Sequence, residues 1–191
     1  MKPIYFLICG MLILVLWIIC CQNISKKTTY IIRQQNQKIE IKLTRQSELQ
    51  YSLIATTFEN GKLLQTNTWP LGYDVFKLDT GDVNNDGSTD ILVGVIKKTR
   101  FDSICRKRLF IFKLLEGYIR PLWLGSRVSQ PLEDFRFCGG KSSGVIRTIE
   151  LEKDGLFLVA EYRWQSFGLA FIRYLVRETP LKQAKYILKT N

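Results

Sequence analysis

Residues 81–95 read GDVNNDGSTDILVGV, an oxygen-rich loop that runs directly into an apolar, β-branched segment. Counted from Asp82, oxygen-bearing side chains stand at positions 1, 3, 5 and 9, and Gly87 permits the bend that makes them converge. Ca²⁺ takes several such hard oxygens, so the loop predicts a calcium site, with a metal-free turn as the alternative. It is not an EF-hand, because position 12 is Val93 instead of the bidentate Glu of that motif. The candidate ligands are the side chains of Asp82, Asn84, Asp86 and Asp90 and the backbone carbonyl of Ser88.

With its flanks from Leu78 to Val95, this segment closely resembles the FG-GAP (VCBS-type) repeat of β-propellers, in which a calcium loop joins two strands of a blade. The resemblance implies the same four side chains and the same carbonyl as ligands. It continues more weakly through residues 108–112 and 121–127, which look like the next pair of strands. Residues 138–142, where a second loop belongs, carry no acid, so the resemblance implies that later blades have lost their metal.

Strand periodicity extends over nearly all of the chain beyond residue 37. Lys38–Leu43 alternates, residues 51–58 are β-branched and aromatic, and ILVGVI (91–96) and LFIFKLL (109–115) indicate buried strands. Asn60-Gly61 indicates a hairpin, while residues 181–189 fit a helix or a closing strand. We therefore predict an all-β domain over 38–191, a small or incomplete β-propeller-like arrangement of antiparallel sheets. Three to four sheets fit the length, because a blade needs about 40–50 residues. A β-sandwich carrying one such loop is the alternative.

The N-terminus reads as a targeting segment over residues 1–21. After Lys2, IYFLICGMLILVLWIICC (4–21) carries no charge, and polar residues follow it at once. The run into Cys21 resembles a bacterial lipoprotein signal, which implies lipidation of that Cys. An uncleaved anchor helix and a secretory signal without lipid remain alternatives. All three place the rest of the chain outside the cytoplasm, in the periplasm or at the cell surface, and the first two tether it to the membrane. Residues 22–37 are polar and rich in Gln and Asn, and we interpret them as a tether.

Two of the five cysteines, Cys105 and Cys138, lie beyond the leader. An even pair in an oxidising compartment favours a disulfide, with two unrelated thiols as the alternative. Residues 97–108 hold six cations and one Asp, and we interpret them as a cationic loop that either binds an anionic partner or is simply solvated. The expected partners are an envelope protein or an anionic glycan. Nucleic acid is not expected, because the leader predicts export.

The chain of 191 residues contains no His, which excludes Ser/His/Asp triads, Cys/His dyads and His-ligated metal sites. The acidic pairs Glu133/Asp134 and Glu150/Glu152 are the remaining candidates for glycosidase chemistry, and only the second pair shares a strand face. We therefore expect a calcium-binding, non-catalytic domain with a binding or structural role at the bacterial envelope. A carbohydrate-active enzyme and a subunit of an envelope assembly are the alternatives. Five aromatic residues are candidates for a platform on which a sugar stacks, with packing in the core as the alternative. They are Trp69, Tyr73, Trp123, Tyr162 and Trp164.

Overall fold

The structure, a computed structural model, describes residues 29–34, 36–47, 50–100, 102–125, 128–139 and 144–190. Its strands form three four-stranded antiparallel sheets, each made of strands consecutive in the sequence. Sheet A contains β1 (Thr29–Gln34), β2 (Gln37–Ser47), β3 (Gln50–Glu59) and β4 (Lys62–Pro70). Sheet B contains β5 (Asp74–Gly81), β6 (Asp90–Thr99), β7 (Asp102–Leu115) and β8 (Tyr118–Trp123). Sheet C contains β9 (Leu132–Cys138), β10 (Val145–Leu151), β11 (Phe157–Gln165) and β12 (Gly168–Thr179).

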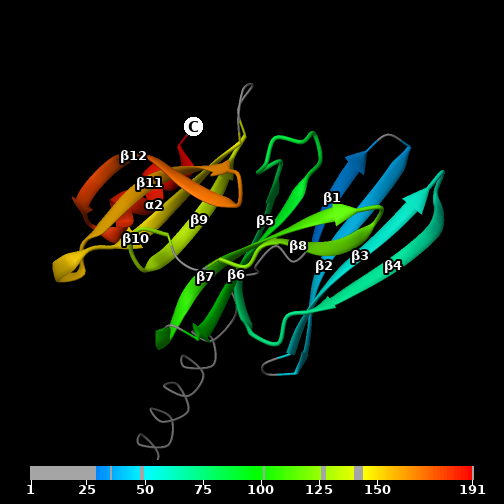
Figure 1. Ribbon diagram of the computed structural model, residues 1–191, viewed down its shortest axis with the longest axis horizontal. Coiled ribbons are helices and arrows are strands. Elements are labelled where there is room, and N and C mark those ends of the chain that lie inside the picture. Colours follow the sequence, from blue (N-terminus) through cyan, green and yellow to red (C-terminus); the bar gives the residue numbers. More distant parts are fainter. Residues whose placement is uncertain are drawn as a thin grey trace, which may run out of the picture.

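The three sheets follow one another along the long axis of the molecule, with sheet B in the centre (Figure 1). Each sheet is an open meander, so the predicted all-β class and the incomplete, propeller-like arrangement of antiparallel sheets are confirmed. A two-sheet sandwich does not form. The 3-10 turn η1 (Lys153–Gly155) joins β10 to β11, and the helix α2 (Leu181–Lys189) follows β12. Among the described residues no helix is both long and apolar enough to span a membrane, and the leader over 1–21 lies outside them.

The second half of the expected tether is part of sheet A. Residues Thr29–Gln34 form β1, which pairs antiparallel with β2 along its whole length. The prediction of a polar tether over 22–37 is therefore wrong from Thr29 onward. The physical reason is that Ile32 is buried in the core, while the Tyr30 hydroxyl donates a hydrogen bond to the Leu78 carbonyl of sheet B at 2.9 Å. Two inward side chains thus hold β1 onto the domain despite its polar neighbours.

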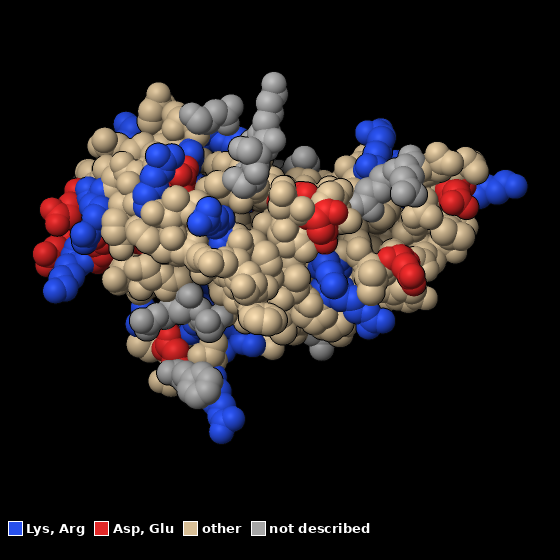
Figure 2. All heavy atoms as spheres, turned by 45° about the horizontal axis from the view of Figure 1, so that its top comes forward, with Lys and Arg blue, Asp and Glu red and all other residues tan. Residues whose placement is uncertain are grey.

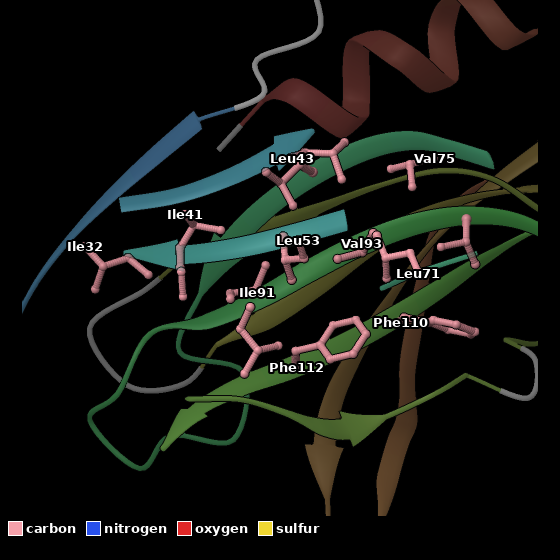
Figure 3. Close-up of a cluster of buried hydrophobic side chains, with 14 of the residues drawn as sticks. Ile32, Ile41, Leu43, Leu53, Leu71, Val75, Ile91, Val93, Phe110 and Phe112 are labelled. Atoms are coloured by element: carbon pink, nitrogen blue, oxygen red, sulfur yellow. The ribbon is translucent and has the colours of Figure 1, made fainter. Parts of the chain in front are cut away.

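The core between sheets A and B is mainly aliphatic, with aromatic rings from both sheets packed on it. Side chains from β1, β2 and β3 point toward those of β5, β6 and β7 (Figure 3). Phe112 of β7 is fully buried, and its ring centroid lies 5.8 Å from that of Trp69 and 6.5 Å from that of Phe110. Trp69 therefore packs in this core. Core packing was one of the two alternatives predicted for the aromatic residues, the other being a sugar platform.

A second core joins sheets B and C and lies directly behind the acidic loop. Phe135 of β9 is fully buried, and its ring meets that of Phe76 edge to face at a centroid distance of 6.0 Å. A Cβ on Gly94 of β6 would lie 2.6–2.9 Å from these two rings, so only glycine fits there. Val83, the second residue of the loop, is 2% exposed in the same core. One end of the loop is thereby fixed by packing.

The outer face of sheet C is covered by α2, so the helical alternative for residues 181–189 is correct. Ala184 and Leu188 are buried against Ile149 and Val159, at the spacing that places them on one side of a helix. Pro180 precedes the first turn and fixes the extended backbone that enters it. The helix covers apolar surface that sheet C would otherwise expose at the end of the stack.

Candidate functional site

The acidic loop connects β5 to β6 at the edge where sheets B and C meet. Gly81 and Asp90 are paired residues of the two strands, so the intervening residues form a closed turn. A Cβ on Gly81 would lie 2.0 Å from the Phe137 ring of sheet C, which shows how closely the loop base approaches β9. The loop therefore projects from a rigid, packed base.

Within the loop, Asp82 organises the backbone. Its Oδ1 accepts a hydrogen bond from the Asp86 amide at 3.1 Å, and its Oδ2 accepts one from the Gly87 amide at 2.9 Å. Asn85 and Gly87 have φ values of 60° and 83°, the left-handed conformation that Asn and Gly adopt most readily. The amide of Ser88 donates to Asp86 Oδ1 at 2.8 Å. The loop thus curls as the sequence predicts.

The buried end of the loop holds an oxygen atom without a partner. Asp90 is fully buried, and its Oδ2 accepts a hydrogen bond from the Val83 amide at 3.0 Å. Its other oxygen, Oδ1, is buried and has no hydrogen-bond partner. Burial raises the pKa of Asp90 to about 6, and the negative charges of Asp86 and Asp82 act in the same direction. A cation at this point would coordinate the unpartnered oxygen of Asp90 and offset the repulsion among the negative charges of Asp82, Asp86 and Asp90.

Asp86 lies at the exposed end of the loop, in a different electrostatic environment. Burial raises its pKa, but hydrogen bonds from Asn84 and Ser88, with the charge of Lys113, outweigh that effect and lower it. The Oδ1 atom of Asn84 also accepts a hydrogen bond from the Asp86 amide at 3.2 Å. Within the described ranges, no three Cys, Asp or Glu side chains converge closely enough to hold a metal by themselves. The expected ligand set therefore depends equally on the Asn84 amide and the Ser88 carbonyl, both of which have the hard oxygen that Ca²⁺ favours.

The first acidic pair joins sheets B and C. Glu133 accepts a hydrogen bond from Lys107 of β7 at 2.7 Å, and Asp134 accepts one from Lys77 of β5 at 2.8 Å. The two neighbouring carboxylates thus bind separate lysines from different strands. As expected from their adjacency, they do not act on a common point.

The second acidic pair is divided between two environments. Glu150 is fully buried and accepts hydrogen bonds from Thr148 at 2.6 Å, Tyr162 at 2.8 Å and the Gln130 amide. Burial raises the pKa of Glu150, although these hydrogen bonds act in the opposite direction. The Glu152 carboxylate instead accepts a hydrogen bond from Arg177, in the C-terminal part of β12. Glu150 therefore holds the segment before β9 in place, and its carboxylate is not open to a substrate.

The two cysteines beyond the leader are free thiols, Cys105 exposed and Cys138 half-buried. Lys107, two residues after Cys105, contacts Glu133 near the start of β9, whereas Cys138 ends that strand. Five residues of extended strand span about 16 Å. The two thiols are not joined in the structure, so the predicted disulfide is not formed there.

The cationic segment 97–108 is mostly strand, which corrects the expectation of a loop. β6 continues to Thr99 and β7 begins at Asp102, so the cations stand on a projecting hairpin. Arg108 and Arg106 both contact Asp102, at 2.9 Å and 3.4 Å. This hairpin borders a cleft of about 580 Å³ between β7 and the segment that leads to β9. Sequence reasoning missed the cleft, because its two walls come together only through the pairing of strands.

No known protein family matches the chain. No curated protein matches it either. Among solved structures, the chain is similar to a protein described as a Xanthomonas type IV secretion system related protein. The TM-score is 0.40 and the sequence identity 8%, over 79% of this chain and 82% of the other. A similarity at this level carries no argument about function, so the function proposed below rests on the residues of this chain.

Proposed function

We propose that this chain is an exported, membrane-tethered β-domain that binds one Ca²⁺ in the loop between β5 and β6 and has a non-catalytic binding role at the bacterial envelope. The metal fixes the turn that joins two strands at the contact between sheets B and C. Its ligands are the side chains of Asp82, Asn84, Asp86 and Asp90 and the carbonyl of Ser88. These are the positions implied by the resemblance to FG-GAP repeats.

The observation that carries the calcium proposal is the unpartnered Oδ1 of Asp90. A buried carboxylate oxygen without a hydrogen bond is unfavourable, and buried polar groups in folded proteins are nearly always satisfied. Asp82 and Asp86 approach Asp90 closely enough to raise its pKa. A divalent cation would coordinate the free oxygen and offset most of the negative charge of Asp82, Asp86 and Asp90.

Replacing Asp90 with asparagine separates a metal site from a metal-free turn. In EGTA, Asp90→Asn is expected to unfold at the same urea concentration as the wild type or a higher one, because it removes a buried charge while keeping the acceptor for Val83. In Ca²⁺ the order is expected to reverse, since the variant loses a charged ligand. Urea unfolding with and without Ca²⁺ measures both effects. Equal stability increments from Ca²⁺ in the two proteins contradict the site.

The tether is tested at Cys21. If the leader is a lipoprotein signal, cells fed a labelled fatty acid are expected to incorporate the label into the wild type and not into Cys21→Ser. Membrane fractions should then hold the wild type, while the variant retains its uncleaved leader. Cys105→Ser is the matched control, because that thiol lies within the β-domain. Equal labelling of wild type and Cys21→Ser contradicts lipidation at this residue.

A further inference from the structure

Two hairpins, β3–β4 of sheet A and β7–β8 of sheet B, are fastened together near their turns. The Gln65 side chain of β4 donates a hydrogen bond to the Glu116 carbonyl in the β7–β8 turn. The Ile119 amide of β8 donates another to the Asn67 side chain of β4 at 2.9 Å. A Cβ on Gly117 would lie 1.8 Å from the Gln65 side-chain nitrogen, so the close contact requires glycine. The two hairpins therefore end in one rigid tip.

This tip exposes four large apolar side chains, each with 45–63% of its surface open to solvent. They are Leu63, Leu64, Leu115 and Tyr118, and we call them the tip patch. Leu115 and Tyr118 are paired residues of β7 and β8, while Leu64 and Tyr118 line one hollow of about 530 Å³. A group of exposed apolar side chains of this kind marks a contact surface.

The charges around the tip patch balance one another. Lys62 is paired across the β3–β4 hairpin with Glu59. The Arg120 guanidinium lies over the Tyr118 ring at 5.7 Å, and Glu116 lines the same hollow as that ring. Basic and acidic side chains are also interspersed on the face shown in Figure 2. The tip patch is therefore suited to apolar contact and not to a partner selected by its charge.

The size of the tip patch favours a lipid surface over a second copy of the chain. Four half-exposed side chains offer roughly half of the about 800 Å² that each partner buries in a stable protein interface. A bilayer sets no such threshold, because an anchor already holds the domain beside it and a few apolar side chains then add to the attachment. Tyrosine with Lys and Arg beside it is also typical of residues at a membrane interface.

The proposed tether is long enough for the tip patch to reach the bilayer. Residues 22–28 separate Cys21 from β1 and can span at most about 25 Å. The tip patch lies at the end of sheet A where β1 turns into β2, since Gln37 at that turn lines the same hollow as Leu64. β1 has six residues, so its first residue is about 17 Å from that end. The domain can thus rest on the tip patch while its first strand remains attached to the anchor.

We propose that the tip patch lies in the headgroup region of the bilayer that anchors the chain, with sheet A next to the membrane and sheet C farthest from it. Because the three sheets follow one another along the long axis, this contact orients the whole domain (Figure 1). The tip is already fastened by its hydrogen bonds, so the contact needs little further ordering. The inference deepens the proposed membrane-tethered role and rests on the tether, but it does not depend on the metal loop.

Photocrosslinking from the full chain tests the contact. The photoreactive residue p-benzoylphenylalanine replaces Leu64 in one variant and Phe167, 93% exposed at a hairpin of sheet C, in the other. Each full chain is purified from the membranes of the expressing bacterium and reconstituted into vesicles of phosphatidylcholine, a lipid without net charge. Position 64 is expected to give at least fivefold more lipid adduct than position 167, measured by mass spectrometry.

A second pair of variants locates the contact on the tip patch. Tyr118→Ser is expected to lower the lipid adduct from position 64 at least threefold, because it removes the ring beside Leu64. Tyr186→Ser removes an exposed tyrosine of α2 and is expected to change that adduct less than twofold. Circular dichroism checks that each variant is folded.

Three outcomes overturn the inference: equal lipid adducts from positions 64 and 167, crosslinking of position 64 to a second copy of the chain in place of lipid, or equal effects of Tyr118→Ser and Tyr186→Ser. A chain that sediments with membranes but forms no lipid adduct at position 64 overturns this inference alone. A chain that does not sediment with membranes overturns the proposed tether together with the inference.

Discussion

Phe112→Ala is expected to lower the free energy of unfolding by about 4 kcal/mol. Phe112 is fully buried between sheets A and B, and its ring packs on those of Trp69 and Phe110. Truncation removes this apolar burial and leaves a cavity that a β-sheet pair can only partly collapse. Urea unfolding measured by circular dichroism gives the change directly.

The matched control is Phe167→Ala, because Phe167 is 93% exposed at the hairpin between β11 and β12. That variant is expected to change the free energy of unfolding by less than about 0.5 kcal/mol. Similar losses in the two variants would mean that sheets A and B do not pack through Phe112.

Glu161→Ala is expected to lower the free energy of unfolding by about 3 kcal/mol. Glu161 accepts a hydrogen bond from Arg147 at 2.9 Å and another from Arg173 at 2.8 Å. Arg147 is 8% exposed and also donates to the Ile187 carbonyl at 3.0 Å, which ties α2 to sheet C. Without Glu161, a buried guanidinium loses its counterion, and this accounts for the size of the effect.

Glu40→Ala is the control for that variant. Glu40 also forms an ion pair, with Lys38 at 2.7 Å, but both side chains are more than one-third exposed. Exposed pairs of this kind contribute little, so the expected loss is below about 1 kcal/mol. Equal losses from the two substitutions would contradict a buried network beneath α2.

The Glu161 contribution is also expected to depend on pH. Burial raises the pKa of Glu161, but the hydrogen bonds and charges of Arg147 and Arg173 outweigh it, so the pKa falls below its ordinary 4.5. The folded state therefore holds fewer protons on this group than the unfolded chain does, and the stability it supplies is lost as pH falls below about 4.5. Comparing the wild type with Glu161→Gln across pH isolates this group, and the difference between them is expected to shrink in acid.

Much of the fold could be predicted because hairpin turns are encoded locally. Asn60 and Gly61 both adopt positive φ values in the turn between the paired strands β3 and β4, as their residue types indicate. β1 could not be predicted from composition. The surrounding Gln and Arg residues give the segment a polar composition, although Tyr30 and Ile32 point into the core. The sequence did not decide between a helix and a strand for residues 181–189. Nine residues are too few for their periodicity to be unambiguous until the surface they pack on is known.

For the site, the sequence predicted the curl of the acidic loop, and its calcium ligands remain a prediction. The unpartnered oxygen of Asp90 was not predictable, because its burial depends on the tertiary packing around the loop. The ion pair between Lys77 and Asp134 joins residues 57 positions apart, which no local pattern indicates. The disulfide prediction failed for the same reason, since a count of cysteines contains no distance.

A thermal melt of the chain in Ca²⁺, in Mg²⁺ and in EGTA tests the central claim most directly, because a ligand that binds only the folded state raises the melting temperature by mass action. At about 100 times the dissociation constant, Ca²⁺ is expected to raise the midpoint by about 5 °C or more, with little effect of Mg²⁺ and no rise in EGTA. Asp86→Ala is expected to remove most of that rise. The same midpoint in Ca²⁺ and EGTA would mean that residues 82–90 form a metal-free turn, and the calcium-binding account would be wrong.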